Sequence, residues 1–470
     1  MFIEELQNRS YKENSKGGLY YGTTFDVNLD VFTMASRFMP EENLIKLFKL
    51  AYLENKELLA ANILYNLDIR GGKGERRVFK TFFHQMCLCD KELAVKILKL
   101  VPSLGRYDYL FEAYQTSIWE DAFIMIRDQL RNDINSDHPS LLAKWMPSLR
   151  THNKNNLFAK RLALKLGYNE KEYRKVLASL RTKLEVVEKN ITQKDYLNIN
   201  YEHVPAKAMK NYHHLFKNND EERFNVYLDS VKGGNAKINT KGLAPYELIK
   251  ASMKNSMDKE VIDELWDKME NFFDNGNSNV LVVADTSGSM SNYDYLPMAS
   301  AVGLAVYAAQ RNTGVFHNKF INFSSNPTFQ QLSGNKLSEM LNSIDYDNWG
   351  ASTNIDAAIK MILKATLASK EECPTHLVII SDMEFDSCTN KKTNFQHWKE
   401  EYQAHGLEMP KIVFWNVAGD VNGVPVTKNE NDVIMVSGFS PAIFKRIFDI
   451  ESYNPINAML EILEPYLQMI

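Results

Sequence analysis

Hydrophobic residues in the first half of the chain recur three or four positions apart, which is the spacing of one helix face. One such stripe runs through Leu44, Phe48 and Tyr52, and similar stripes continue to about residue 266. Because a stripe of this kind packs a helix against a core, we expect this half to be almost entirely helical. Many short helices joined by short loops favour an α-helical repeat (HEAT-like) array, although no fixed repeat length is visible.

The second half changes character after the polar, turn-rich segment Asn275–Asn279. Apolar runs of strand length then alternate with helical stripes. This alternation predicts an α/β domain with a doubly wound parallel sheet, Rossmann-like in plan. We therefore expect two domains, at residues 1–274 and 275–470. The predicted strands are 280–284, 317–323, 376–381, 411–417 and 433–436, and the predicted helices are 297–311, 336–344, 355–368, 393–405, 441–448 and 455–467.

Composition narrows the class of protein. Apolar residues make up 44% and charged residues 24% of the chain, as in ordinary globular proteins. The longest mostly apolar stretch, Met298–Ala309, is well short of the ~20 residues that cross a bilayer, so no membrane partner is expected. The N-terminus lacks the basic and then apolar pattern of a secretory signal, which predicts a cytoplasmic location. The four cysteines should be reduced, and none has zinc-site spacing to histidines.

The net charge of −4 conceals a difference between the two halves. Residues 279–470 hold 13 Lys and Arg against 21 Asp and Glu, a net of −8, which leaves +4 for residues 1–278. The segment Lys144–Lys189 carries 12 basic and 4 acidic residues, a net of +8. Such a segment can hold the backbone of structured or single-stranded RNA by counterion release; the alternative is helix faces that are merely solvated. The candidate RNA contacts are Lys171, Arg174, Lys175 and Arg181.

The residues with the clearest chemistry follow the first predicted strand. Asp285, Ser287 and Ser289 alternate along a tight loop that contains a glycine. Thr353, just before a predicted helix, and Asp382, at the end of another predicted strand, bring two more oxygen groups to the same edge of the sheet. Carboxylate and hydroxyl oxygens suit Mg²⁺, which prefers octahedral oxygen coordination and keeps several waters.

This pattern resembles the von Willebrand factor A domain and its metal-ion-dependent adhesion site, which has the form D-x-S-x-S followed by a distant threonine and a distant aspartate. The resemblance implies that all five residues are ligands of Mg²⁺ or another divalent cation, Ser287 and Ser289 directly and some of the others through water. It also implies that a protein partner donates a carboxylate to the open coordination position. Two alternatives are a serine-rich turn without metal and a metal that only stabilises the loop.

A second resemblance covers nearly the whole chain. The segments Asp68–Arg76, Trp145–Ser148 and Asn198–Pro205 look like those of an uncharacterised family with a helical N-terminal half and a C-terminal A domain. The same two-part plan is that of the TROVE module of the Ro ribonucleoprotein autoantigen, whose ring of HEAT-like helices binds RNA. That likeness rests on architecture and the metal motif.

Two further motifs have ordinary explanations. The glycine-rich run Arg70–Arg77 lacks the preceding strand and the hydroxyl residue of a Walker loop, so we favour a helix-to-helix turn over an anion site. Glu384 lies two residues beyond Asp382, but no nucleophile with a base partner is evident beside it. The sequence therefore predicts a non-enzymatic, RNA-binding or ribonucleoprotein-like scaffold with a metal adhesion site. The alternative is a metal-dependent protein–protein adaptor without nucleic acid.

Overall fold

The computed structural model describes residues 11–14, 17–149, 156–273, 279–347, 349–369, 373–388, 392–418, 423–448 and 450–470. The chain divides into two compact units. The first combines Met1–Val78 with Thr240–Met469, and the second is Phe79–Asn239, with Ile470 assigned to it. The predicted boundary at 274/275 marks where helices give way to the sheet, but the compact units are divided at other positions, because the first 78 residues pack with the sheet.

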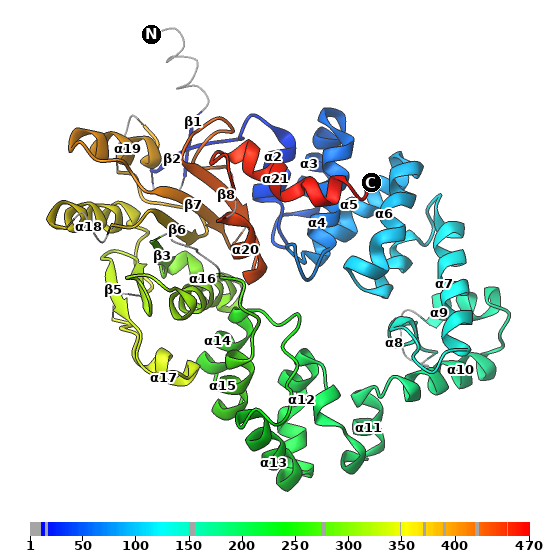
Figure 1. The fold of residues 1–470 in the computed structure, drawn as a ribbon. Coiled ribbons are helices and arrows are strands. Elements are labelled where there is room, and N and C mark those ends of the chain that lie inside the picture. Colours follow the sequence, from blue (N-terminus) through cyan, green and yellow to red (C-terminus); the bar gives the residue numbers. More distant parts are fainter. Residues whose placement is uncertain are drawn as a thin grey trace. The chain divides into compact units, whose positions relative to one another are not determined.

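A six-stranded sheet forms the centre of the first unit (Figure 1), with the strand order β5-β4-β3-β6-β7-β8. Neighbouring strands are parallel except β5, which runs antiparallel to β4. The predicted α/β sheet is therefore confirmed as a mixed sheet rather than a purely parallel one. The strands are β3 (Val280–Asp285), β4 (Lys319–Phe323), β5 (Thr328–Gln331), β6 (His376–Ser381), β7 (Lys411–Asn416) and β8 (Val433–Ser437).

Helices from the second half of the chain pack around this sheet. Helix α16 (Asn292–Arg311) contacts β3, and α18 (Ile355–Ala368) contacts β4. The fully buried strand β3 explains the uninterrupted apolar run in the sequence, because a parallel strand covered on both faces has no polar side. The remaining helices of this part are α14 (Pro245–Met253), α15 (Lys259–Asp267), α17 (Leu337–Asn342), α19 (Asn394–Ala404), α20 (Phe444–Ile447) and α21 (Pro455–Leu467).

The N-terminal segment belongs to the same core. Helix α2 (Val27–Met34) contacts β8 and α21, and α4 (Lys56–Leu67) packs on α21. The Ser437 hydroxyl at the end of β8 donates to the carbonyl of Phe32 at 3.0 Å. Tyr466 of α21 donates its hydroxyl to Asp68 at 2.9 Å. These buried contacts join residues about 400 positions apart, so the sheet and the first helices form one hydrophobic core. Helix α3 (Glu41–Glu54) packs on α2 and α4.

The described secondary-structure elements of the second unit are all helices. Its helices pack mainly on neighbours in the sequence, such as α12 on α13, and α10 on α8 and α9, which agrees with the helical prediction for this segment. A HEAT-like repeat remains a prediction. The helices are α5 (Arg76–Cys89, which begins in the first unit), α6 (Lys91–Leu104), α7 (Trp119–Ile134), α8 (Leu142–Trp145), α9 (Asn156–Lys165), α10 (Glu170–Lys183), α11 (Val187–Gln193), α12 (Ala206–Asn219) and α13 (Glu221–Lys232).

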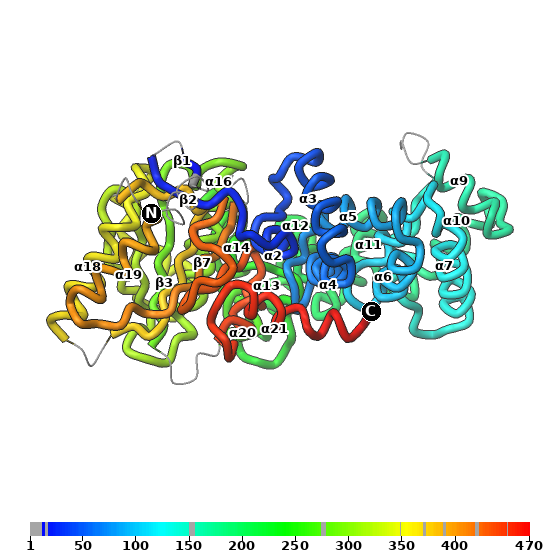
Figure 2. The backbone as a smooth tube through the Cα atoms, turned by 90° about the horizontal axis from the view of Figure 1, so that it is seen from above, coloured from blue at the N-terminus to red at the C-terminus, as the bar shows by residue number. Residues whose placement is uncertain are grey.

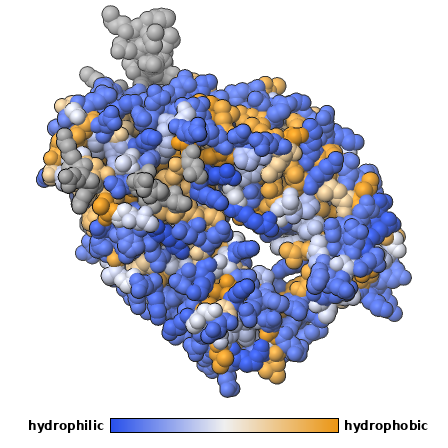
Figure 3. Space-filling view, viewed as in Figure 1, coloured by the Kyte–Doolittle hydropathy of each residue, from blue (hydrophilic) through white to orange (hydrophobic). Residues whose placement is uncertain are grey.

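Polar residues predominate on the face of the molecule that Figure 3 displays. Hydrophobic residues on that face occur in smaller groups between the hydrophilic ones. Among the described residues, no helix has both the length and the hydrophobicity that a bilayer span requires.

Candidate metal centre

The candidate centre begins where β3 ends. Strands β3 and β6 are parallel neighbours with Ala284 paired to Ile380, so both strands end at the same edge of the sheet. Asp285, the last residue of β3, is fully buried there. The hydroxyl of Ser381, the last residue of β6, donates to Oδ2 of Asp285 at 2.5 Å. The sheet register therefore fixes the Asp285 carboxylate at the carboxyl edge, as the sequence predicts.

The loop after β3 brings the two serines toward this carboxylate. The backbone N–H of Ser287 donates to Oδ1 of Asp285 at 2.9 Å, and the Oγ atoms of Ser287 and Ser289 lie 3.2 Å apart. Ser287 is fully buried and Ser289 is half-buried. Three oxygen-bearing side chains thus lie together at the start of this loop.

Thr353 is held beside the same loop by backbone hydrogen bonds. Gly288 donates its N–H to the carbonyl of Ala351 at 2.9 Å, and Gly350 donates to the carbonyl of Thr286 at 2.8 Å. A Cβ atom at position 288 would lie 2.9 Å from the carbonyl oxygen of Gly350, so only glycine permits this approach. Thr353 itself is fully buried.

Asp382 completes the group from the end of β6. Its Oδ1 accepts the N–H of Glu384 at 3.0 Å, and the N–H of Asp386 donates to the carbonyl of Thr353 at 3.0 Å, which ties this loop to the threonine loop. Burial, together with the nearby charge of Asp382, raises the pKa of Asp285 well above the usual range of an aspartate. The structure thus gathers all five predicted ligand positions at one sheet edge.

The donor set fits a divalent cation of the magnesium kind. Two carboxylates lie close together in a buried place, and the hydrogen-bond partners of Asp285 are the neutral residues Ser287 and Ser381. Buried anions without positive compensation are costly, and a bound Mg²⁺ would provide that compensation. Asp, Ser and Thr supply the hard oxygens that this ion prefers.

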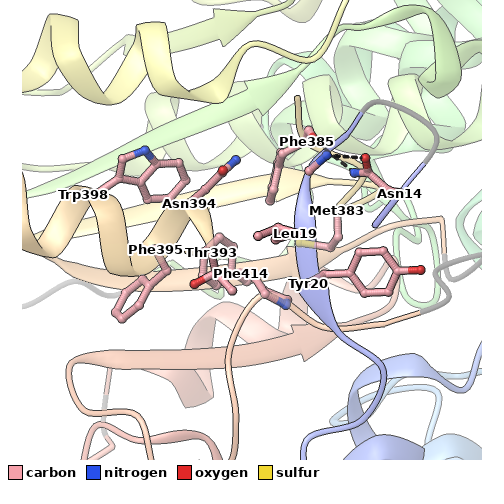
Figure 4. Close-up of a pocket in the computed structure, with 12 residues that line it drawn as sticks. Asn14, Leu19, Tyr20, Met383, Phe385, Thr393, Asn394, Phe395, Trp398 and Phe414 are labelled. Carbon is pink, nitrogen blue, oxygen red and sulfur yellow. Dashed lines mark hydrogen bonds between the residues drawn. The ribbon is translucent and has the colours of Figure 1, made fainter. Parts of the chain in front are cut away.

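An N-terminal hairpin covers the loop that follows Asp382. The strands β1 (Tyr11–Glu13) and β2 (Leu19–Tyr21) pair antiparallel, a pairing that the helical prediction for this half did not include. The Asn14 side chain donates to the carbonyl of Phe385 at 2.8 Å. Figure 4 shows Leu19 lying between Phe385 and the aromatic residues of β7 and α19, in a small pocket with a mixed polar and apolar lining. The hairpin therefore fixes the segment just beyond a predicted ligand.

The four predicted RNA contacts all lie on α10 but differ in their surroundings. Lys171 and Lys175 are exposed, and Arg174 forms a 2.8 Å ion pair with Glu170 of the same helix. Arg181 instead donates to the carbonyls of Ala143 and Met146, both at 2.9 Å. Arg181 therefore supports the end of α8 and is poorly placed for a ligand phosphate.

The aromatic residues of the basic segment are also constrained. Tyr173 is 1% exposed, and its hydroxyl donates to the carbonyl of Pro147 at 2.9 Å. A ring in that position cannot stack on a base. Tyr168 is half-buried.

The glycine-rich run after α4 is a helix-to-helix turn, as favoured from the sequence. Lys73 points inward, is 3% exposed and donates to the carbonyl of Phe32. Glu75 is also buried and forms a two-pronged contact with Arg37, with the shortest N–O distance 2.7 Å. These side chains serve the core and are directed away from any external anion.

A second group of potential metal ligands was not predicted from the sequence. Asp356, Cys388 and His397 offer ligand atoms that all lie within 4.8 Å of one another. Burial, with the charge of Asp356, raises the pKa of the Cys388 thiol to about 12. The chain separation of 32 residues between the aspartate and the cysteine hides the group from any search by spacing.

Comparisons with known proteins give similarity without a described function. Residues 279–461 match a family model described as "Domain of unknown function (DUF7788)", and residues 120–276 match one described as "Domain of unknown function (DUF2828)". "Uncharacterized protein L728" of Acanthamoeba polyphaga mimivirus is 28% identical over 513 residues, an alignment that covers 98% of this chain and 88% of that protein. The similarity to the viral protein thus extends over both halves of the chain.

Proposed function

We propose that the sheet-containing part is a divalent-metal-dependent binding module of the von Willebrand factor A type, without enzymatic activity of its own. One ion, Mg²⁺ or a similar cation, would be held at the carboxyl edge of the sheet. Its open coordination position would receive a carboxylate from a protein partner. The proposed ligands are Asp285, Ser287, Ser289, Thr353 and Asp382.

The observation that carries this proposal is the buried pair of carboxylates at the ends of two neighbouring parallel strands. Asp285 and Asp382 approach closely enough for one charge to raise the pKa of the other. Ser287 and Ser289 lie on the loop after β3, and Thr353 lies on a second loop that is hydrogen-bonded to the first. An arrangement that is unfavourable without a cation is favourable with one, because the ion neutralises both charges.

The test is the thermal unfolding of chelator-treated, full-length protein with increasing Mg²⁺. Binding to the native state stabilises it by about 2.7 kcal/mol at a hundred times the dissociation constant. We expect Asp285→Ala to abolish this stabilisation and Glu384→Gln, two residues beyond a proposed ligand, to retain it. An equal magnesium effect in Asp285→Ala and the parent would contradict the site.

Separate experiments test the protein partner and the proposed lack of enzymatic activity. An acidic peptide should bind in magnesium and dissociate when the ion is chelated, since its carboxylate needs the metal. Incubation of the magnesium form with nucleoside triphosphates, RNA or phosphodiesters should give no turnover. Turnover that Glu384→Gln removes while metal binding persists would identify an enzyme instead.

RNA binding is a second candidate, supported by the net charge of +8 over Lys144–Lys189 and by the exposed lysines of α10. We expect RNA of any sequence to bind more weakly when three charges are reversed by Lys171→Glu, Arg174→Glu and Lys175→Glu. The slope of the logarithm of the binding constant against the logarithm of the salt concentration should become shallower by about one unit per lost phosphate contact. A filter assay at low salt would measure this. If the parent protein retained no RNA in this assay, RNA binding would be rejected and the metal-dependent protein-binding function would remain.

A further inference from the structure

The strongest remaining feature is the mixed group of sulfur, nitrogen and oxygen ligands on the α18–α19 side of the sheet. Asp356 is in the first turn of α18, His397 is near the start of α19, and Cys388 is in the segment between β6 and α19. The two helices pack side by side (Figures 1 and 2). Asp356 thus meets two ligand residues that lie 32 and 41 positions later in the chain.

We propose that Asp356, Cys388 and His397 form a second metal site, specific for Zn²⁺ or a similar borderline-soft cation. Their ligand atoms all lie within 4.8 Å of one another, and all three residues are half-buried. Zinc accepts thiolate, imidazole and carboxylate in tetrahedral coordination, and three protein ligands leave the fourth position for water. The donor set differs in kind from the all-oxygen set at the sheet edge, which favours magnesium.

Residues around the group hold the ligands in place. Trp398 Nε1 donates to Oδ1 of Asp356 at 3.1 Å, and the backbone N–H of Cys388 donates to Oδ1 of Asn394 at 3.3 Å, a contact that does not need the thiol proton. Nε2 of His397 lies 3.3 Å from a carboxylate oxygen of Glu401. Carboxylate partners of this kind orient metal-bound imidazoles in known sites.

The charge balance also suits a dication. A thiolate and the Asp356 carboxylate together supply two negative charges. Lys360 lies 2.7 Å from Oδ2 of Asp356, but each carboxylate oxygen has two lone pairs and can serve a metal and a hydrogen bond together. Binding requires the thiol to lose its proton, so uptake of zinc should release a proton.

The place of this site gives it a structural role. Cys388 ends the described loop that begins at Asp382, and Asp356 follows Thr353 by three residues. A zinc ion would join these two segments to α19. It would thereby stiffen the loops that carry two of the proposed magnesium ligands, without entering their coordination.

The test uses cobalt(II) as a spectroscopic substitute for zinc in chelator-treated, full-length protein. A bound thiolate gives a sulfur-to-cobalt charge-transfer absorption, which we expect to saturate at one equivalent and to disappear when zinc is added. Cys388→Ser should remove the absorption, and His397→Gln should weaken cobalt binding at least tenfold. The matched control is Cys373→Ser, because this half-buried cysteine lies outside the group and its thiol donates to the Ser369 carbonyl at 3.3 Å; the control should keep the parent spectrum.

Two results would overturn the proposal: a folded parent without the sulfur-to-cobalt absorption, or the absorption retained in Cys388→Ser. Circular dichroism of the metal-free proteins establishes whether each variant is folded. If Cys388→Ser does not fold, His397→Gln provides the test, and unchanged cobalt binding in that variant would overturn the proposal. Asp285→Ala should keep the cobalt spectrum, so the two metal sites are tested separately.

Discussion

The Lys73 side chain is buried beside α2, with its ammonium group 5.3 Å from the centre of the Phe32 ring. It donates to the Phe32 carbonyl, and the Ser437 hydroxyl donates to the same oxygen. Burial lowers the pKa of Lys73 to about 7, because a charged amine is poorly solvated there. A single lysine thus makes the stability of the core depend on pH.

The sign of this dependence follows from proton binding. Between pH 7 and the unfolded pKa of about 10.4, the unfolded chain binds more protons at Lys73 than the native chain, so the free energy of unfolding rises with pH. We expect the parent to gain up to about 3 kcal/mol over Lys73→Met between pH 7 and pH 9.5. Urea unfolding at both pH values measures this gain. The control Lys49→Met replaces an exposed lysine of α3 and should show the same gain in stability with pH as the parent. If Lys73→Met also showed the parent's pH dependence, the lowered pKa of Lys73 would be contradicted.

Helix α10 shows how one element divides its charged residues between packing and solvent. Arg181 donates to two carbonyls near the end of α8, where helical carbonyls lack partners within their own helix. Arg174, on another face, pairs with Glu170 and is 60% exposed at its side chain. The first arginine maintains the position of a neighbouring helix, whereas the second faces water.

Removal of each arginine should therefore have a different effect. Arg181→Ala removes the donor from two carbonyls and should lower the free energy of unfolding by about 1–3 kcal/mol. Arg174→Ala should change it by less than about 0.5 kcal/mol, since exposed ion pairs contribute little. Denaturant unfolding of both variants provides the comparison. Equal losses would mean that Arg181 has no special packing role.

Elements with local capping signals could be predicted to the residue. Helix α18 begins after Asn354, whose side chain accepts the Ala357 N–H, and α21 begins with Pro455. The predicted start of α16 is five residues late, because residues 293–295 adopt left-handed backbone angles and form an irregular turn ahead of the regular helix. Strand β5 was missed because its sequence, TFQQ, lacks an apolar run.

One of the two candidate metal sites could be predicted from the sequence and the other could not. The place of four of the five proposed oxygen ligands could be predicted because parallel neighbouring strands end at a common edge, so residues at the ends of β3 and β6 meet there. Thr353 reaches the same edge on the loop before α18. The Asp356–Cys388–His397 group depends on how α18 packs on α19, and no sequence pattern encodes that contact. The role of Arg181 was also missed, because a charge count does not reveal which cations bind backbone carbonyls.

At the scale of the molecule, residues 1–78 complete the sheet-containing core. Helices α2 and α4 cover apolar surface on β8 and α21, and Tyr21 forms a bridge with Val424. A fragment of residues 275–470 would expose this surface, and exposed apolar patches promote aggregation.

We therefore expect the 275–470 fragment to be poorly soluble and to unfold without a cooperative transition. Co-expression of residues 1–78 with residues 240–470 should restore a soluble complex with a sharp thermal transition. Co-purification and calorimetry measure both properties. A 275–470 fragment that unfolds as sharply as the complex would show that the N-terminal segment is dispensable.

The discontinuous first unit also dictates an order of assembly during synthesis. Its opening 78 residues leave the ribosome before the whole of Phe79–Asn239 has been made. Helix α21 is complete only at Leu467, 389 residues after Val78, and at about 5–20 residues per second that interval lasts roughly 20 to 80 seconds. The apolar faces of the nascent helices α2 and α4 remain uncovered through this interval, because β8 and α21 are among the last elements of the first unit to be synthesised. Chaperone dependence should therefore centre on residues 1–78, and moving the codons for these residues to follow those for residues 79–470 should reduce it.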